Sequence, residues 1–340
     1  RQLSKQETNQ MPTTSTSLSL PWTPTFGHQA PPPFATSTDF LSSRSHRRAP
    51  HFTCKPISAS HPSPPPPDFR GEKEEEENYE EEEEEDVEYE VLTRVRSMYN
   101  DIVIVDTPTL RMLLLDSTGN VHSVRYKGGR KRTGGYWDEF ASLPAIIPEG
   151  PVAMLGLGGG TAVHLMLDLW PSLQLEGWEI DEILIHKARE YFGLSDLEKD
   201  NQAGGRLRVH IGDALSPSKN SSQRYAGIIV DLFSEGDVLD QLLKVETWLH
   251  LKDRLIANGR LMVNCGGVTP GTESVDESTW LKNSVIKTLR EAFPGQLSWK
   301  RMPKKQGANY LAFTGPQPDL STWSAALPPY LSESVYQWKP

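Results

Sequence analysis

The chain has 340 residues and a formal net charge of −10, but residues 71–90 alone hold fourteen acidic residues and one lysine, so residues 91–340 are nearly neutral. A neutral body without a basic stripe argues against general nucleic-acid binding, and no run of about 18 apolar residues could span a membrane. The two cysteines, Cys54 and Cys265, exclude a disulfide framework and a cysteine-rich zinc site. We expect a soluble protein of a reducing compartment.

Residues 1–70 predict a disordered extension. The stretch between Met11 and Cys54 is rich in Ser, Thr and Pro, and Asp39 is its only acidic residue. This composition is typical of an organellar transit peptide, most simply one that directs a plant protein to the chloroplast, with Met11 as the true start. The alternative is a tail without a targeting role, which leaves the protein in the cytoplasm.

Residues 71–90 predict an extended and solvated linker. Like charges along this acidic tract repel one another, and the four prolines at 64–67 block helix formation just before it. The tract is either a spacer or a contact for a basic partner.

A small antiparallel β domain is predicted over residues 91–135. Short β-rich runs lie at 102–105, 112–115 and 121–124, and turn sequences separate them. A Gly-Gly break at 134–135 ends this region, and a helix is expected to follow over 136–147.

Residues 136–315 alternate between strand and helix patterns, which predicts a parallel sheet with helices on both faces. Strands are expected at 152–155, in a run that reaches residues 179–181, and at 207–211, 225–230 and 260–264, with a closing hairpin of 296–302 and 309–314. Helices are expected over 161–170, through residue 192, and over 240–257 and 276–292. Residues 316–340 form a C-terminal extension whose aromatic side chains suit packing or oligomer contacts.

Four predicted strands end in residues that suit a nucleoside site, because ligands of such sheets bind beyond the carboxyl ends of the strands. The first strand leads into a glycine loop, and the next three lead to acids; these residues are Gly156, Gly158, Gly159, Gly160, Glu179, Asp213 and Asp231. Glycines let a ligand approach the following helix, and a carboxylate at the position of Glu179 can accept both ribose hydroxyls. Each acid taken singly also suits a helix cap or a solvated loop.

The acidic strand ends favour a cationic nucleoside over a dinucleotide. A dinucleotide carries a pyrophosphate, which Asp231 would repel at close range. Thr161 also replaces the third glycine of the dinucleotide motif. We therefore expect a ligand of the S-adenosylmethionine type, whose sulfonium is positive, rather than NAD.

Residues 97–315 resemble the spermidine and spermine synthases, which are polyamine aminopropyltransferases with a small amino-terminal sheet. Residues 97–102, Ser-Met-Tyr-Asn-Asp-Ile, are similar to the family's S-x-Y-Q-D-I. Gly-Tyr-Trp-Asp at 135–138 and Leu-Pro at 143–144 are similar to S-Y-Q-E…L-P. The resemblance implies a Rossmann-like class I methyltransferase fold with a seven-stranded sheet, and a divergent, spermidine synthase-like member of the S-adenosylmethionine-dependent methyltransferase superfamily.

The resemblance also implies transfer of an aminopropyl group from decarboxylated S-adenosylmethionine to a polyamine nitrogen, with Asp231 orienting the amine and accepting its proton. In this comparison Asn100, Glu179 and Asp213 hold the adenosine, and Tyr136 lines the amine channel. The donor-binding set is Asn100, Gly156, Gly158, Gly159, Gly160, Glu179, Asp181, Asp213 and Ala214. The acceptor-side set is Tyr136, Trp137 and Glu235.

Several positions depart from the family pattern. Gly159 stands where the family has an aspartate that receives the donor's ammonium, and losing such a partner costs on the order of 1–3 kcal/mol. Trp137 replaces a glutamine, and Ser142 replaces a histidine. The second acid of the family's D-S-S-D-P loop is displaced by one place to Glu235, which either replaces it or is a solvated loop residue.

Two other functions remain open. A methyltransferase would use intact S-adenosylmethionine, whose carboxylate would find room beside the backbone N–H groups of residues 158–160 when position 159 is a glycine. A non-catalytic nucleoside-binding relative is the other alternative, because Trp137 alters the amine pocket. We expect a small-molecule polyamine or other amine acceptor, no nucleic acid, no membrane and no metal, because the histidines lack ligand-like spacing. A homodimer is left open.

Overall fold

The computed structural model describes residues 88–340 except 131, 217–222, 268–276 and 304–308. The predicted extension 1–70 and nearly all of the predicted acidic linker lie outside the described residues. Within the described part of the chain, no helix has the length and apolar character needed to cross a bilayer.

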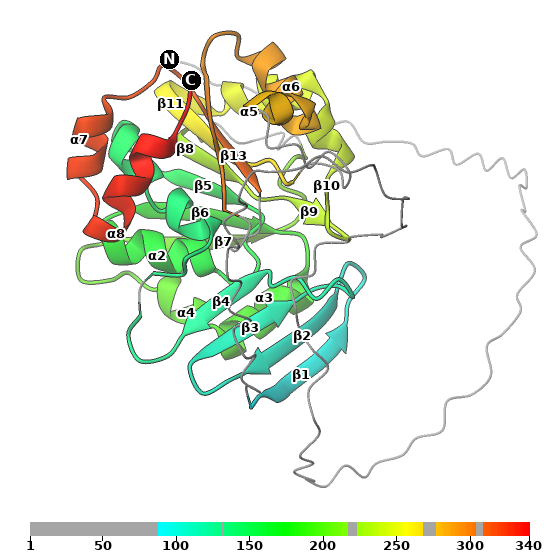
Figure 1. Ribbon diagram of the computed structural model, residues 1–340. Helices are drawn as coiled ribbons and strands as arrows, with labels where there is room; N and C mark the ends of the chain where they lie inside the picture. The colour runs from blue at the N-terminus through cyan, green and yellow to red at the C-terminus, as the bar shows by residue number, and fades with distance from the viewer. Residues whose placement is uncertain (1–87, 131, 217–222, 268–276, 304–308) are drawn as a thin grey trace, which may run out of the picture. The chain divides into compact units, whose positions relative to one another are not determined.

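Four antiparallel strands form a small sheet in the order β1-β2-β3-β4 (Figure 1). The strands are β1 Glu90–Arg96, β2 Asp101–Asp106, β3 Leu110–Leu114 and β4 Ser123–Tyr126. Ile102, Ile104 and Leu113 of this sheet are fully buried and pack with Leu184 and Phe192 of the larger domain. The predicted small antiparallel domain is therefore confirmed. Its first strand, which begins at Glu90, was not predicted.

Seven strands form a second sheet in the order β12-β13-β11-β8-β5-β6-β7. Their bounds are β5 Val152–Leu155, β6 Gln174–Glu179, β7 Arg206–Ile211, β8 Tyr225–Val230, β11 Leu255–Asn264, β12 Leu297–Arg301 and β13 Tyr310–Thr314. The pairs among β7, β6, β5, β8 and β11 are parallel, and β13 runs antiparallel to both of its neighbours. The mostly parallel seven-stranded sheet and its closing hairpin are as predicted.

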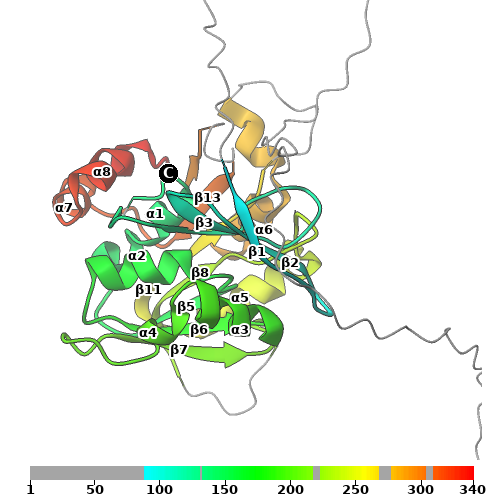
Figure 2. The same ribbon diagram turned by 90° about the horizontal axis from the view of Figure 1, so that it is seen from below.

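Helices cover both faces of this sheet, because its strands are apolar on both sides (Figure 2). Met154 and Ile229 face one cluster and Ala153 and Ile228 face the other. The first face carries α1 Tyr136–Phe140, α2 Thr161–Leu169, α3 Glu182–Tyr191, α4 Leu194–Leu197, α7 Leu320–Ala325 and α8 Pro329–Ser332. The second carries α5 Val245–Asp253 and α6 Ser284–Ala292.

Three predicted helices are shorter than expected. The helix predicted over 136–147 divides into α1 and a 3-10 turn, η1 Leu143–Ile146, because Pro144 begins a new turn. The helix predicted over 276–292 divides into η3 Glu277–Lys282 and α6, because Asn283 is extended and its side chain caps α6 by accepting the N–H of Ile286.

The helix predicted over 240–257 is also wrong at both ends. Residues 240–243 form a separate 3-10 turn, η2 Asp240–Leu243, and Lys244 is extended between this turn and α5. At the other end, Leu255 already belongs to β11 and pairs with Tyr225 of β8. Tertiary pairing with β8 therefore overrides the helical pattern there.

The C-terminal segment packs on the large sheet. Trp323 and Trp338 are buried against Phe313 of β13. Lys300 of β12 and Glu139 of α1 form a buried ion pair of 2.7 Å, and Lys300 Nζ also donates to Ser334 Oγ at 2.6 Å. Residues 316–340 are thereby fixed to the domain by apolar packing and by one buried charge network.

Candidate functional site

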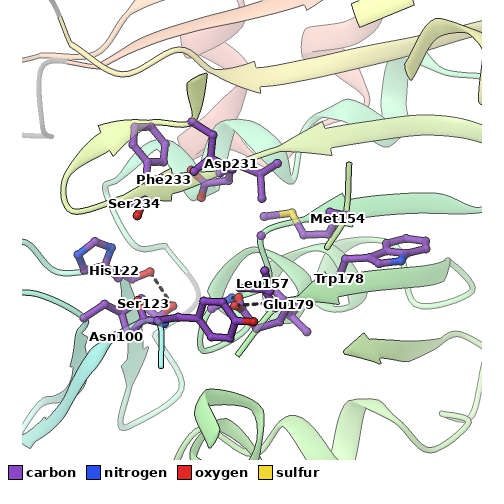
Figure 3. Close-up of a pocket in the computed structure, with 18 of the residues that line it drawn as sticks. Asn100, His122, Ser123, Met154, Leu157, Trp178, Glu179, Asp231, Phe233 and Ser234 are labelled. Atoms are coloured by element: carbon purple, nitrogen blue, oxygen red, sulfur yellow. Dashed lines mark hydrogen bonds between the residues drawn. The ribbon is translucent and has the colours of Figure 1, made fainter. Parts of the chain in front are cut away.

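A pocket of about 380 Å³ opens where the carboxyl ends of β5, β6, β7 and β8 face the small sheet. Asn100, His122 and Ser123 lie on one side of it and Trp178 on the other, and Asp231 lies across from Glu179 (Figure 3). A cavity therefore lies at the predicted strand ends, and the small sheet supplies one of its walls.

The glycine loop after β5 needs backbone conformations that suit glycine. Gly156, Gly158 and Gly160 have positive φ angles of 88°, 54° and 87°. A Cβ at position 156 would lie 2.0 Å from the carbonyl oxygen of Asp231, so the two strand ends can meet only with a glycine there. This close approach brings Asp231 against the loop.

The N–H groups of this loop already have partners. Gly158 donates to Glu179 Oε2 at 3.1 Å, Gly159 donates to Ser123 Oγ at 2.8 Å, and Gly160 donates to the carbonyl of Leu157 at 3.0 Å. The backbone donors that an incoming carboxylate would need at 158–160 are thus engaged within the protein.

Glu179 ends β6 and is fixed by backbone donors. Its Oε1 accepts the N–H groups of Ile180 and Asp181 at 3.0 and 3.2 Å, and its Oε2 accepts that of Gly158. Burial raises the pKa of Glu179 against the lowering effect of these hydrogen bonds. The carboxylate is held at the pocket wall, where ribose hydroxyls could compete for its oxygens.

Asp231 directly follows β8 and has a partner on each carboxylate oxygen. Asn264 Nδ2 donates to Oδ1 at 2.9 Å, and the Tyr136 hydroxyl donates to Oδ2 at 3.1 Å. Burial raises the pKa of Asp231 from 3.8 to about 6, although both hydrogen bonds lower it. Burial, followed by the charge of Asp231, raises the pKa of Tyr136 well above 10.0, so this phenol stays a donor. A carboxylate with such a pKa suits general-base chemistry near neutral pH.

Asp181 does not line the pocket. Its Oδ1 accepts the N–H groups of Ile183 and Leu184 at the start of α3, and its Oδ2 accepts hydrogen bonds from Ser97 Oγ and Asn100 Nδ2 at 2.5 and 2.7 Å. Asp181 therefore joins α3 to the turn between β1 and β2, and it positions Asn100 at the pocket wall.

A β-hairpin follows Asp231 and contributes another wall. It consists of β9 Phe233–Ser234 and β10 Asp237–Val238, and Glu235 and Gly236 between them have positive φ angles of 52° and 85°. This pair of φ values is typical of a two-residue hairpin turn. Phe233, Ser234 and Glu235 all line the pocket, while Glu235 is exposed at the turn.

Trp178 and the turn after β7 form the opposite wall. Asp213 and Ala214 line the pocket with Trp178, and the carbonyl of Ala214 accepts a hydrogen bond from Arg254 at 3.0 Å. The Arg254 guanidinium also lies 5.4 Å from the Trp178 ring. This contact orders the turn that presents Asp213 to the cavity.

Most of the predicted site residues are brought together. The pocket is lined by Asn100, Gly156, Gly158, Glu179, Asp213, Ala214, Asp231, Tyr136, Trp137 and Glu235. Gly159, Gly160 and Asp181 do not line it; they shape the loop and hold its neighbours. Their roles toward a ligand stay predictions.

Several residues that line the pocket, and one residue that holds Asp231 in place, were not predicted from the sequence. The missed lining residues include Met98, Tyr99, His122, Ser123, Trp178, Ile180, Phe233 and Ser234. Asn264, which holds Asp231, was also missed, although it ends a predicted strand beside the one that ends at Asp231 and could have been found on that ground.

The charged side chains that line the pocket are acidic. Glu179, Asp213, Asp231 and Glu235 line it, and among the described residues no lysine or arginine does. Burial lowers the pKa of His122, which favours its neutral form. The cavity therefore suits a cationic ligand. No group of three or more potential metal-binding side chains occurs among the residues that the structure describes.

Comparisons with known proteins agree with this picture. No protein-family model matches the chain. It is 26% identical over 219 residues to a "Probable polyamine aminopropyl transferase" of Bifidobacterium longum, covering 62% of this chain and 46% of that protein. It is 25% identical over 190 residues to a "Polyamine aminopropyltransferase" of Vibrio vulnificus, covering 51% and 58%. The chain thus spans about half the length of these curated relatives.

A methyltransferase is also among the relatives. The chain is 26% identical over 163 residues to an "eEF1A lysine and N-terminal methyltransferase" of Mus musculus, covering 44% of this chain and 21% of that protein. These three relatives are transferases by name. The sequence resemblance to polyamine aminopropyltransferases is confirmed, together with a likeness to methyltransferases.

Solved structures establish the fold. A spermidine synthase in complex with the transition-state analogue AdoDATO matches with a TM-score of 0.52 and 18% identity, covering 71% of this chain and 78% of that chain. The spermidine synthase of Thermotoga maritima matches with a TM-score of 0.50 and 18% identity, covering 71% and 77%. The fold is the Rossmann-like class I methyltransferase fold preceded by a small β domain.

Proposed function

We propose that this chain is a spermidine synthase-like aminopropyltransferase, which moves the aminopropyl group of decarboxylated S-adenosylmethionine to an amine acceptor. The observation that carries the proposal is the pairing of Asp231 with Tyr136 and Asn264 at the end of an acidic pocket without a lysine or arginine among the described residues. Both substrates are cations, and this pocket offers them only neutral and negative side chains.

The chemistry follows from the protonation state of the acceptor. An ammonium is not a nucleophile, so one proton must leave before the nitrogen attacks. Asp231 accepts that proton, and the freed lone pair attacks the aminopropyl carbon bonded to the sulfonium. The carbon–sulfur bond breaks, its electron pair stays on sulfur, and a neutral thioether nucleoside leaves. The Tyr136 hydroxyl and the Asn264 amide keep Asp231 in place for this step.

Two features support the decarboxylated donor over the intact one. An intact donor brings a carboxylate, and the N–H groups of Gly158, Gly159 and Gly160 that were predicted to receive it are hydrogen bonded within the protein. The pocket walls offer four carboxylates that would repel it.

Methyl transfer to another acceptor is the second candidate. The observation that favours it is Gly159, because an acid at this position would repel the carboxylate that an intact donor carries beside its ammonium. A likeness to a curated methyltransferase supports it as well. On this candidate Asp231 would still serve as the base for a nitrogen acceptor.

A turnover assay tests the proposal. The full chain is incubated with decarboxylated or intact S-adenosylmethionine, each combined with putrescine, spermidine and spermine, and products are identified by mass spectrometry. We expect aminopropyl products, and a loss of about 10²–10⁴-fold in turnover for Asp231→Asn with donor affinity within a few-fold. Methylated products would favour the second candidate. Donor binding without turnover on any amine would favour a non-catalytic role.

A chloroplast location is a separate proposal, which the composition of residues 11–54 supports. A fusion of residues 11–70 to a fluorescent protein tests it in plant cells, where accumulation in chloroplasts is expected and a cytoplasmic signal would contradict it.

A further inference from the structure

The amide of Asn264 has a defined orientation. Asn264 is the last residue of β11, is 1% exposed, and lies beside the end of β8, which leads to Asp231. Its Oδ1 accepts the backbone N–H of Gly266 at 3.1 Å and a hydrogen bond from Asn309 Nδ2 at 3.1 Å. A backbone N–H can only donate, so the Gly266 contact assigns the oxygen to that side and leaves Nδ2 for Asp231.

We propose that Asn264 is the positioning residue of Asp231, and that Gly266 and Asn309 act through it by fixing which end of its amide faces the carboxylate. The inference rests on the proposed function only in naming Asp231 as a base; the arrangement itself is independent of the reaction. Asn309 lies immediately before β13, on the far side of β11 from β8, so a residue of the closing hairpin supports the site through one intermediate side chain.

The arrangement has a chemical consequence. Asp231 loses hydration in the pocket, and the Asn264 N–H compensates its negative form at one oxygen while the Tyr136 hydroxyl does so at the other. The other titratable groups that line the same pocket are His122, Glu179, Asp213, Glu235 and Tyr99. None of these is hydrogen bonded to Asp231 in the described structure, so Asn264 and Tyr136 are its two direct side-chain partners.

A carboxyl titration tests the proposal without reference to turnover. The full chain is labelled with [4-¹³C]aspartate, the signal of Asp231 is assigned by its absence in Asp231→Asn, and its titration is followed by NMR. Asn264→Ala removes the donor, so we expect the midpoint to rise by about one pH unit. Asn264→Asp keeps the shape and places a second carboxylate against Asp231, so we expect a rise of about two units or more for the pair.

The controls separate positioning from general damage. Asn309→Ala should raise the midpoint by less than Asn264→Ala, because Gly266 still holds the amide. Asn201→Ala deletes an exposed amide far from Asp231 in the sheet, which is hydrogen bonded to Pro171, Ala203 and Gly205 beside the amino-terminal end of β7, and should leave the midpoint unchanged. An unchanged midpoint in both Asn264 variants would overturn the proposal. The titration midpoint of Asp231 can be measured even if the protein has no transferase activity. Failure of this proposal is therefore distinguishable from failure of the proposed function.

Discussion

The side chain of Ser123 fills the space in which a side chain at position 159 would lie. Ser123 Oγ accepts the N–H of Gly159 at 2.8 Å, and a Cβ added to Gly159 would lie 2.8 Å from the Ser123 Cβ and 3.3 Å from Phe192. The absence of an acid at position 159 is therefore coupled to the small sheet, which closes over the glycine loop at this point.

This coupling predicts that an aspartate cannot be restored alone. Gly159→Asp forces the loop and Ser123 apart, and overpacking of this kind costs about 1–3 kcal/mol in the free energy of unfolding. Gly159→Asp combined with Ser123→Gly should recover much of that loss. Urea denaturation of the single and double variants checks this. Equal stability of the wild-type chain and Gly159→Asp would contradict the packing described here.

The pKa of Asp231 predicts the acidic limb of the pH–activity profile. Below a pKa of about 6 this carboxyl is protonated and cannot accept the acceptor's proton, so kcat/KM should fall about tenfold per pH unit there. The measurement is kcat/KM for the best donor and amine between pH 4.5 and 8. A limb near pH 4 would mean that burial does not raise this pKa.

The same shift predicts how Asp231 affects stability. The carboxyl has a pKa of about 6 in the folded chain against an ordinary value of 3.8, so the folded state binds the proton more tightly than the unfolded state does. The free energy of unfolding therefore falls as pH rises between these values, by about 3 kcal/mol at most.

Asp231→Asn has no carboxyl group at this position, so its free energy of unfolding should not show this fall with rising pH. Its stability relative to the wild-type chain should increase between pH 4 and 7, as measured by urea denaturation at both values. A difference that does not change with pH would contradict the expectation.

The buried ion pair of Lys300 and Glu139 predicts a large loss of stability when one of its two charges is removed. The two side chains are only 3% and 7% exposed, so Lys300→Met leaves the Glu139 carboxylate buried without its partner. This should lower the free energy of unfolding by about 3–5 kcal/mol, as measured by urea denaturation. Adding Glu139→Gln removes the unpaired charge and should recover part of this loss.

A surface pair provides the control for that measurement. The side chains of Lys187 and Glu190 on α3 are 25% and 52% exposed, so water screens this pair and Lys187→Met should cost less than about 1 kcal/mol in the free energy of unfolding. Similar losses for Lys187→Met and Lys300→Met would show that burial of the ion pair does not determine its contribution.

Much of the fold was predictable because its signals are local. Buried strands such as Val152–Leu155 and Tyr225–Val230 are continuous apolar runs, and a parallel sheet covered on both faces requires that pattern. The wrong helix predictions lie where a contact with another element determines the local structure. Leu255 pairs with β8 instead of continuing a helix. Asn283 interrupts a second helix, because its side chain caps α6 and also donates to the carbonyl of Cys265, which follows β11.

The sequence by itself determined the parallel sheet, the acids at its strand ends and the resemblance to aminopropyltransferases. The sheet and the place of the acids follow from periodicity and from the rule that parallel strands present their carboxyl ends at one edge. The resemblance rests on short motifs such as Ser-Met-Tyr-Asn-Asp-Ile at residues 97–102. Only the tertiary structure decided that Ser123 meets Gly159 and that Asp181 meets Asn100. Such contacts depend on side-chain directions across distant elements, and hydrophobic periodicity carries no information about them.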